Sequence, residues 1–156
     1  MSIEVGQPAP DFTLPSDTDG DVTLSALKGK PVVLYFYPKD NTPGCTTEAC
    51  DFRDRIERVQ AHGAVVLGVS RDSLKRHENF RKKYDLNFPL LSDKDPEGAV
   101  HQLYGAWGEK KMYGRVSIGP IRSTVLIDAE GNVAKHWPKV RVKGHADAVI
   151  EALEAL

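Results

Sequence analysis

The two cysteines are the residues of this chain whose type and spacing could support redox chemistry. Cys45 and Cys50 stand five positions apart in the segment 41–54, NTPGCTTEACDFRD. A thiolate is both a nucleophile and a metal ligand, so the pair could be catalytic, could bind a metal, or could be two inert buried thiols. Two cysteines are too few for a disulfide framework, and the surrounding residues must therefore decide.

The residues just before Cys45 favour its ionisation. Thr42 is a preferred N-cap residue and Pro43 suits the first helical position, so the pattern predicts a helix that carries Cys45 in its first turn. The unpaired N–H groups and the dipole of a helix N-terminus stabilise an anion. We therefore expect Cys45 to lose its proton readily and to act as a nucleophile.

Strands and helices that alternate along the chain must position this segment. The apolar run 31–38, PVVLYFYP, predicts a central strand that is buried on both faces and ends at Pro38. The helix that follows carries an apolar stripe (Ala49, Phe52, Ile56 and Val59) and is expected to stop at Gly63. A second core strand is predicted over 64–70.

The remaining pattern completes an α/β domain. We expect a short strand over 21–24, a polar surface helix over 73–84, a third strand over 89–92 and a helix over 96–104. The stretch 105–119 is interpreted as a loop. Segments 122–128 and 133–137, joined by a turn, predict a β-hairpin, and residues 145–156 predict an amphipathic helix that buries Val149, Leu153 and Leu156.

Length and composition indicate an ordinary globular chain. The 156 residues suit one domain over 1–156, and 40% of them are hydrophobic and 28% charged, with a formal net charge of -1. The balanced charge argues against nucleic acid as a partner, and no apolar run is long enough to cross a membrane. The first residues show no secretory signal pattern, so we expect a cytoplasmic protein.

Several motifs resemble the peroxiredoxin family. Pro38, Thr42 and Cys45 match its active-site pattern, and the segment 41–54 is similar to the bacterioferritin-comigratory-protein branch, also called peroxiredoxin Q. Further similar strings follow in the same order: GQPAPDFTLP (6–15), GVSRDS (68–73), FPLLSD (88–93), YGAWGEKKMYG (104–114) and IRSTVLID (121–128). The resemblance therefore extends over nearly the whole chain.

This resemblance implies a fold and a set of roles. The fold would be thioredoxin-like, with an N-terminal extension and insertions, and its central mixed sheet would be flanked by helices. Cys45 would attack hydrogen peroxide or an organic hydroperoxide and become a sulfenic acid. Thr42 would bind a peroxide oxygen, Pro38 would shield the site from water, and Arg122 would favour the thiolate and orient the peroxide.

Glu48 is a candidate supporting residue of the same site. It follows Cys45 by three positions, close to one helical turn. A carboxylate at that place would by itself oppose formation of a thiolate. Glu48 therefore fits the site only if a cation such as Arg122 pairs with it.

The family branch implies that Cys50 resolves the sulfenic acid by forming a disulfide with Cys45. Five residues along an intact helix separate the two Cα atoms by roughly 8.6 Å, whereas a disulfide requires about 7 Å or less. We therefore predict that the first turns of the helix unwind after oxidation. The resemblance also implies regeneration by thioredoxin or glutaredoxin, and a monomer. The alternative for Cys50 is simple packing.

Other functions remain open from the residues alone. A thioredoxin-like disulfide oxidoreductase normally has two residues between its cysteines, whereas four separate Cys45 and Cys50. A redox-sensing or holdase module would keep the reactive cysteine with negligible turnover. The histidines are scattered without metal-ligand spacing, so a zinc site is not expected and each is interpreted as a surface or packing residue: His62, His77, His101, His136 and His145. No cofactor motif appears.

Overall fold

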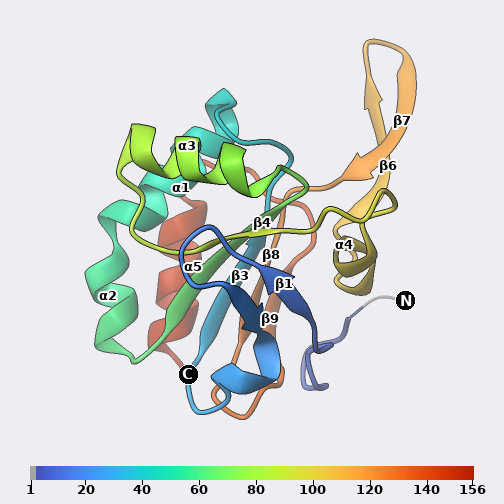
Figure 1. The fold of residues 1–156 in the computed structure, drawn as a ribbon. Helices are drawn as coiled ribbons and strands as arrows, with labels where there is room; N and C mark the ends of the chain where they lie inside the picture. Colours follow the sequence, from blue (N-terminus) through green and yellow to red (C-terminus); the bar gives the residue numbers. More distant parts are fainter. Residues whose placement is uncertain (1–2) are drawn as a thin grey trace.

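A computed structural model describes residues 3–156 and shows a five-stranded mixed sheet with helices on both faces (Figure 1). Met1 and Ser2, part of the segment searched for a signal pattern, lie outside the described residues. The strand order is β5-β4-β3-β8-β9. The strands are β3 (Val32–Phe36), β4 (Val65–Ser70), β5 (Leu90–Ser92), β8 (Ser123–Ile127) and β9 (Val133–Trp137). This is the thioredoxin-like arrangement expected from the sequence.

The central strand β3 is buried along its whole length, as its apolar run predicts. It pairs in parallel with β4 and antiparallel with β8. One face of the sheet packs against α1 (Pro43–Asp54), α2 (Ile56–Ala61), α3 (Leu74–Tyr84) and α5 (His145–Glu154). The other face packs against β1 (Thr13–Pro15), β2 (Asp21–Thr23), the 3-10 helix Leu24–Leu27 and α4 (Ala99–Leu103).

The helix predicted from Thr42 to Gly63 is divided in two. Its apolar stripe is buried as expected, since Phe52 and Val59 are both fully excluded from solvent. The division falls at Arg55, whose φ of -113° and ψ of 10° separate α1 from α2. Arg55 Nε donates to Asp147 Oδ1 of α5 at 2.7 Å, a tertiary contact that no local pattern reports.

The expected loop over 105–119 is wrong. Strands β6 (Trp107–Met112) and β7 (Arg115–Pro120) form an antiparallel hairpin that projects from the body of the molecule (Figure 1). Tyr113 and Gly114 make the turn with φ of 53° and 77°, the left-handed region that two-residue hairpin turns use. Most of β7 is exposed on both faces, so its sequence lacks the apolar alternation of a half-buried strand.

Two other details differ from the predictions. The helix α3 is not only a polar surface helix, because it buries His77 and Phe80 against the body of the protein. Leu156, predicted to be buried, lies beyond the end of α5 and is 57% exposed, whereas Val149 and Leu153 are buried as expected. Within residues 3–156, the helices are all too short or too polar to cross a membrane.

Candidate active site

Cys45 lies in the first turn of α1, directly after the central strand. Thr42 precedes the helix with an extended backbone (φ -92°, ψ 156°), and Pro43 occupies the first helical position, as the sequence predicts. The Cys45 side chain is 1% exposed and belongs to the core beneath the helices. A helix start in this position presents unpaired N–H groups beside the sulfur, an environment that stabilises negative charge.

Arg122, the residue just before β8, lies far from Cys45 in the sequence but contacts its sulfur. Its Nη2 donates to Cys45 Sγ at 3.3 Å. Its Nη1 donates to Glu48 Oε1 at 2.7 Å. Burial alone would lower the pKa of Arg122, but the negative charges of Glu48 and Cys45 outweigh burial and raise it. The guanidinium is therefore a permanent cation at the sulfur, and it meets the condition stated for Glu48, that a cation pairs with its carboxyl group.

Glu48 is a buried acid whose pKa is raised. Its side chain is 1% exposed, and burial raises its pKa from 4.5 to about 7, although Arg122 acts in the opposite direction. Oε1 is held by Arg122, whereas Oε2 is buried with no hydrogen-bond partner among the described residues. The carboxylate and the sulfur therefore share one guanidinium, and each competes for its positive charge.

Thr42 and Pro38 both lie in the segment between β3 and α1. Thr42 occupies the N-cap position, but its hydroxyl does not cap the helix: Oγ1 donates to Lys39 O at 2.8 Å. A hydroxyl whose proton is already used in a hydrogen bond still has oxygen lone pairs. These lone pairs can accept a hydrogen bond from a ligand. Pro38 follows β3 and is half-buried, which agrees with its expected place at the end of that strand.

Cys50 lies further along the same unbroken helix. Both cysteines are free thiols, and Cys50 is half-buried. Burial raises the pKa of the Cys50 thiol, with Arg53 acting against that shift. The helix α1 runs continuously through both positions, so the expected geometric obstacle to a disulfide is present in this state.

Two residues beside the site were not identified from the sequence. Lys110 of β6 is half-buried, and burial together with the charge of Arg122 lowers its pKa, while Cys45 acts in the opposite direction. The His145 ring places Nε2 2.8 Å from Thr124 Oγ1, and burial followed by the charge of Arg122 lowers its pKa to about 4. Lys110 lies in the family-like string 104–114, but only the β6–β7 hairpin brings this residue to the site.

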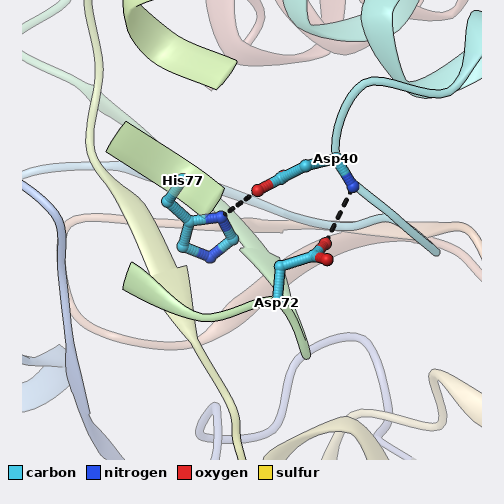
Figure 2. A group of neighbouring side chains, drawn as sticks. All are labelled: Asp40, Asp72 and His77. Atoms are coloured by element: carbon cyan, nitrogen blue, oxygen red, sulfur yellow. Dashed lines mark hydrogen bonds and ion pairs between the residues drawn. The ribbon is translucent and has the colours of Figure 1, made fainter. Parts of the chain in front are cut away.

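A separate polar group gathers Asp40, Asp72 and His77, whose candidate ligand atoms all lie within 4.8 Å of one another (Figure 2). The expectation that every histidine is a surface or packing residue therefore misses a polar network. His77 Nδ1 lies 2.6 Å from Asp40 Oδ2, and Nε2 lies 2.9 Å from Leu91 O. Both ring nitrogens thus already have protein partners, and the group is a hydrogen-bond network within the protein.

Comparison with known proteins gives a consistent set of similarities. The AhpC/TSA family profile matches residues 5–136. A putative peroxiredoxin bcp of Coxiella burnetii is 53% identical over 153 residues, covering 98% of this chain and 100% of that protein. The peroxiredoxin Bcp of Bacillus subtilis is 51% identical over 156 residues, covering 100% of this chain and 96% of the relative.

Solved structures show the same similarity in three dimensions. The bacterioferritin comigratory protein of Xanthomonas campestris, studied for its alkyl peroxide reduction activity, superposes with a TM-score of 0.89 at 44% identity, over 97% of this chain and 98% of that one. A cysteine-to-serine mutant of Xylella fastidiosa PrxQ gives a TM-score of 0.92 at 37% identity, over 99% and 98% of the two chains.

Proposed function

The chain belongs to the AhpC/TSA family and to its peroxiredoxin Q branch, and from this premise we propose that it is a thiol peroxidase in which Cys45 reduces hydrogen peroxide and organic hydroperoxides. The observation that carries the proposal is the contact of Arg122 Nη2 with Cys45 Sγ at 3.3 Å. A buried cysteine at a helix start, held against a permanent cation, has what a nucleophilic thiolate requires.

In the first step the Cys45 thiolate attacks one peroxide oxygen. The S–O bond forms as the O–O bond breaks, and the leaving oxygen takes up a proton as water or an alcohol. Cys45 is left as a sulfenic acid. Arg122 donates hydrogen bonds to the reacting oxygens and stabilises the charge that develops on them. Thr42 Oγ1 accepts a hydrogen bond from the peroxide, and Pro38 excludes water from the sulfur.

Glu48 has a positioning role in this mechanism. Its Oε1 fixes the orientation of Arg122 through the 2.7 Å contact. Its raised pKa, about 7, limits the negative charge that would otherwise oppose the thiolate. The carboxyl group can therefore hold the guanidinium without neutralising it fully.

In the second step the Cys50 sulfur attacks the sulfur of the Cys45 sulfenic acid. A disulfide forms and the sulfenic oxygen leaves as water. This makes the protein an atypical 2-Cys peroxiredoxin and requires α1 to unwind, because the helix holds the two cysteines too far apart. A thiol reductant then returns both cysteines to the starting state. We assign this reduction to thioredoxin, or to glutaredoxin, by dithiol exchange.

The proposed setting is a monomer in the cytoplasm. Residues 1–156 form one domain in this proposal, because both faces of a single sheet are packed by the elements around it. The active site takes its side chains from α1, from the segment between β3 and α1, and from the residue before β8 of the same chain. A cytoplasmic location supplies reduced dithiol proteins for the last step.

The test is thioredoxin-coupled peroxide reduction by the wild type, Cys45→Ser and Cys50→Ser. Cys45→Ser should lose activity, and Cys50→Ser should still form a sulfenic acid that a dimedone reagent traps, but should lose turnover with thioredoxin. Thr47→Ser, an exposed position on the same helix, is the matched control. Full activity in Cys45→Ser would refute the proposal, and full turnover in Cys50→Ser would identify a one-cysteine enzyme.

A further inference from the structure

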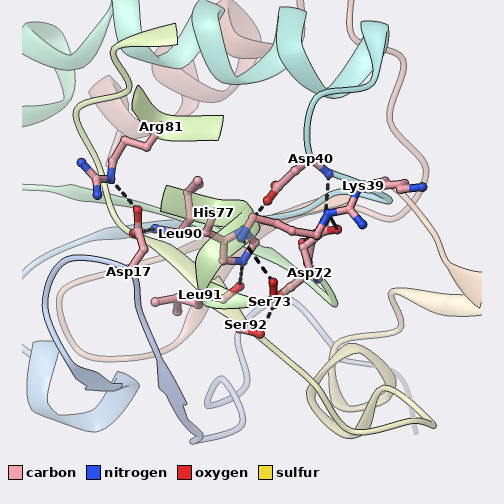
Figure 3. Close-up of polar contacts among 12 residues, drawn as sticks. Asp17, Lys39, Asp40, Asp72, Ser73, His77, Arg81, Leu90, Leu91 and Ser92 are labelled. Carbon is pink, nitrogen blue, oxygen red and sulfur yellow. Dashed lines mark hydrogen bonds and ion pairs between the residues drawn. The ribbon is translucent and has the colours of Figure 1, made fainter. Parts of the chain in front are cut away.

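His77 lies on α3, fully excluded from solvent, between the loop that leads to α1 and the strand β5 (Figures 2 and 3). Its Nε2 lies 2.9 Å from Leu91 O. A carbonyl oxygen can only accept, so Nε2 carries a proton. Its Nδ1 lies 2.6 Å from Asp40 Oδ2, and a second proton must lie in that contact. The imidazole is therefore fixed at both nitrogens.

Asp40 is held from three directions. Its Oδ1 accepts from Tyr37 Oη at 2.6 Å, and its Oδ2 faces His77. Its backbone N–H donates to Asp72 Oδ2 at 2.8 Å. Tyr37 occupies Oδ1, so the second proton of the imidazole contact lies between His77 Nδ1 and Asp40 Oδ2. Burial opposes the charge on His77, but the hydrogen bond and charge of Asp40 outweigh burial and raise the pKa of His77.

The helix α3 also holds the next residue of the loop. Tyr84 Oη donates to Asn41 Oδ1 at 3.0 Å, and Asn41 adopts the left-handed conformation with φ of 61°. Two consecutive loop residues, Asp40 and Asn41, are thus anchored to one helix. The residue after them is Thr42, whose hydroxyl donates back to Lys39 O at 2.8 Å. The whole segment 39–42 is fixed in one conformation immediately before Cys45 enters the helix.

We propose that His77 is a positioning residue for the peroxide step: by clamping Asp40 it fixes the backbone that presents Thr42 to the substrate. The inference rests on the proposed function, in which Thr42 binds peroxide. A buried ion pair is costly unless all its hydrogen bonds are made, and here each atom of the pair has a partner. Breaking the clamp moves Thr42 away from the peroxide, without altering the Arg122 contact to the sulfur.

Two substitutions separate the two contacts of the imidazole. In His77→Asn the amide nitrogen occupies the place of Nδ1 and can still donate to Asp40. In His77→Gln it reaches the place of Nε2 and can donate only to Leu91 O. Positioning through Asp40 predicts that His77→Gln slows the reaction of Cys45 with hydrogen peroxide by about tenfold or more, and that His77→Asn recovers most of this loss. Stopped-flow tryptophan fluorescence measures both rates.

Three further readouts distinguish positioning from a general structural role. The rate at which the reductant regenerates oxidised His77→Gln should equal that of the wild type, because Thr42 does not act in that step. Alkylation of Cys45 by iodoacetamide should also keep its rate, because Arg122 and α1 are untouched. His62→Gln, at the exposed end of α2, is the matched control. Urea unfolding of every variant shows whether a slower peroxide step merely follows lost stability.

Equal losses in His77→Asn and His77→Gln, or losses that follow the urea midpoint, would overturn the inference. If both variants fail to fold, Tyr84→Phe tests the same loop from a half-buried position, by removing the bond to Asn41. It should slow the peroxide step by about two- to tenfold, roughly the net worth of one hydrogen bond, and an unchanged rate would again overturn the proposal. A wild-type protein without peroxide reaction would instead refute the function on which the inference rests.

Discussion

Arg122 and Glu48 form a buried ion pair, with Nη1 2.7 Å from Oε1, and the same guanidinium contacts the sulfur of Cys45. Two groups that can each carry a negative charge therefore share one cation. Where a single positive charge serves two acids, ionisation of one opposes ionisation of the other. The reactivity of the cysteine is thus linked to the protonation of Glu48, and this link can be measured.

Glu48→Gln should make Cys45 more reactive toward a neutral alkylating agent. Glutamine keeps an oxygen that can accept from Arg122, but it has no charge to compete with the thiolate. At pH 8, above the pKa of about 7 of Glu48, the rate of alkylation by iodoacetamide should rise by at least about threefold. Glu57→Gln on the exposed side of α2 serves as the control, and it should leave the rate unchanged. A slower alkylation in Glu48→Gln would show that the carboxylate assists the thiolate instead.

Glu48 should also change how the free energy of unfolding depends on pH. The pKa of Glu48 is raised from 4.5 to about 7 in the folded protein. Between these values the unfolded chain releases this proton and the folded chain keeps it, so its contribution to stability is present below pH 4.5 and is lost as the pH rises to about 7. The free energy of unfolding of Glu48→Gln, relative to the wild type, should increase by about 3 kcal/mol over this interval.

Urea unfolding at several pH values measures that difference. The control is Glu78→Gln, because Lys82 lowers the pKa of Glu78 and the sign of its pH dependence is therefore opposite. The stability of Glu78→Gln relative to the wild type should fall, not rise, as the carboxylate ionises. A difference between Glu48→Gln and the wild type that stays constant from pH 4.5 to pH 7 would contradict the assignment of Glu48 as the raised acid.

Gly44→Ala should lower activity without lowering stability. A Cβ at this position would lie 3.1 Å from Arg122 Nη2, so the guanidinium must shift by a few tenths of an ångström, which disturbs its contact with the sulfur. The backbone of Gly44 is helical, and alanine is favoured over glycine there by up to about 1 kcal/mol. The peroxide rate should fall by about tenfold, while the urea midpoint is unchanged or higher.

Gly119→Ala is the matched control for that experiment. Gly119 also lacks a positive φ, and a Cβ built there meets no atom within 4 Å. Its peroxide rate should remain that of the wild type. If Gly44→Ala retained the full peroxide rate, the position of the guanidinium would not limit the reaction, and the role given to Arg122 would need revision.

The elements that the sequence predicts well are those with a strong local pattern. The run 31–38 is rich in β-branched and aromatic residues and becomes the buried strand β3, and Thr42-Pro43 marks the start of α1 as capping preferences require. The hairpin β6–β7 was missed because an exposed strand has no apolar alternation to detect. The break falls at Arg55, which contacts Asp147, a residue 92 positions away.

Some features of the site likewise follow from the local sequence, whereas others depend on contacts between residues far apart in the chain. The helix start that carries Cys45 follows from its neighbours in the sequence. Nothing local places Arg122 at the sulfur, 77 residues further on, and only the resemblance to a family suggested it. The contact of His77 with Asp40 spans 37 residues and was not predicted, because a single histidine in a polar helix has no distinguishing pattern. Contacts between residues far apart in the sequence can be identified only once the fold is known.

Oxidation should unfold the first turns of α1, because the intact helix keeps Cys45 and Cys50 apart. One equivalent of hydrogen peroxide should accelerate amide exchange over residues 45–50 by at least about tenfold, as protection by helical hydrogen bonds is lost. The amides of Val149 and Ile150, in the buried part of α5, should stay protected. Cys50→Ser, which stops at the sulfenic acid, should keep its helix under the same treatment. An oxidised wild-type protein that contains the disulfide and retains slow exchange throughout α1 would contradict this link between resolution and unwinding.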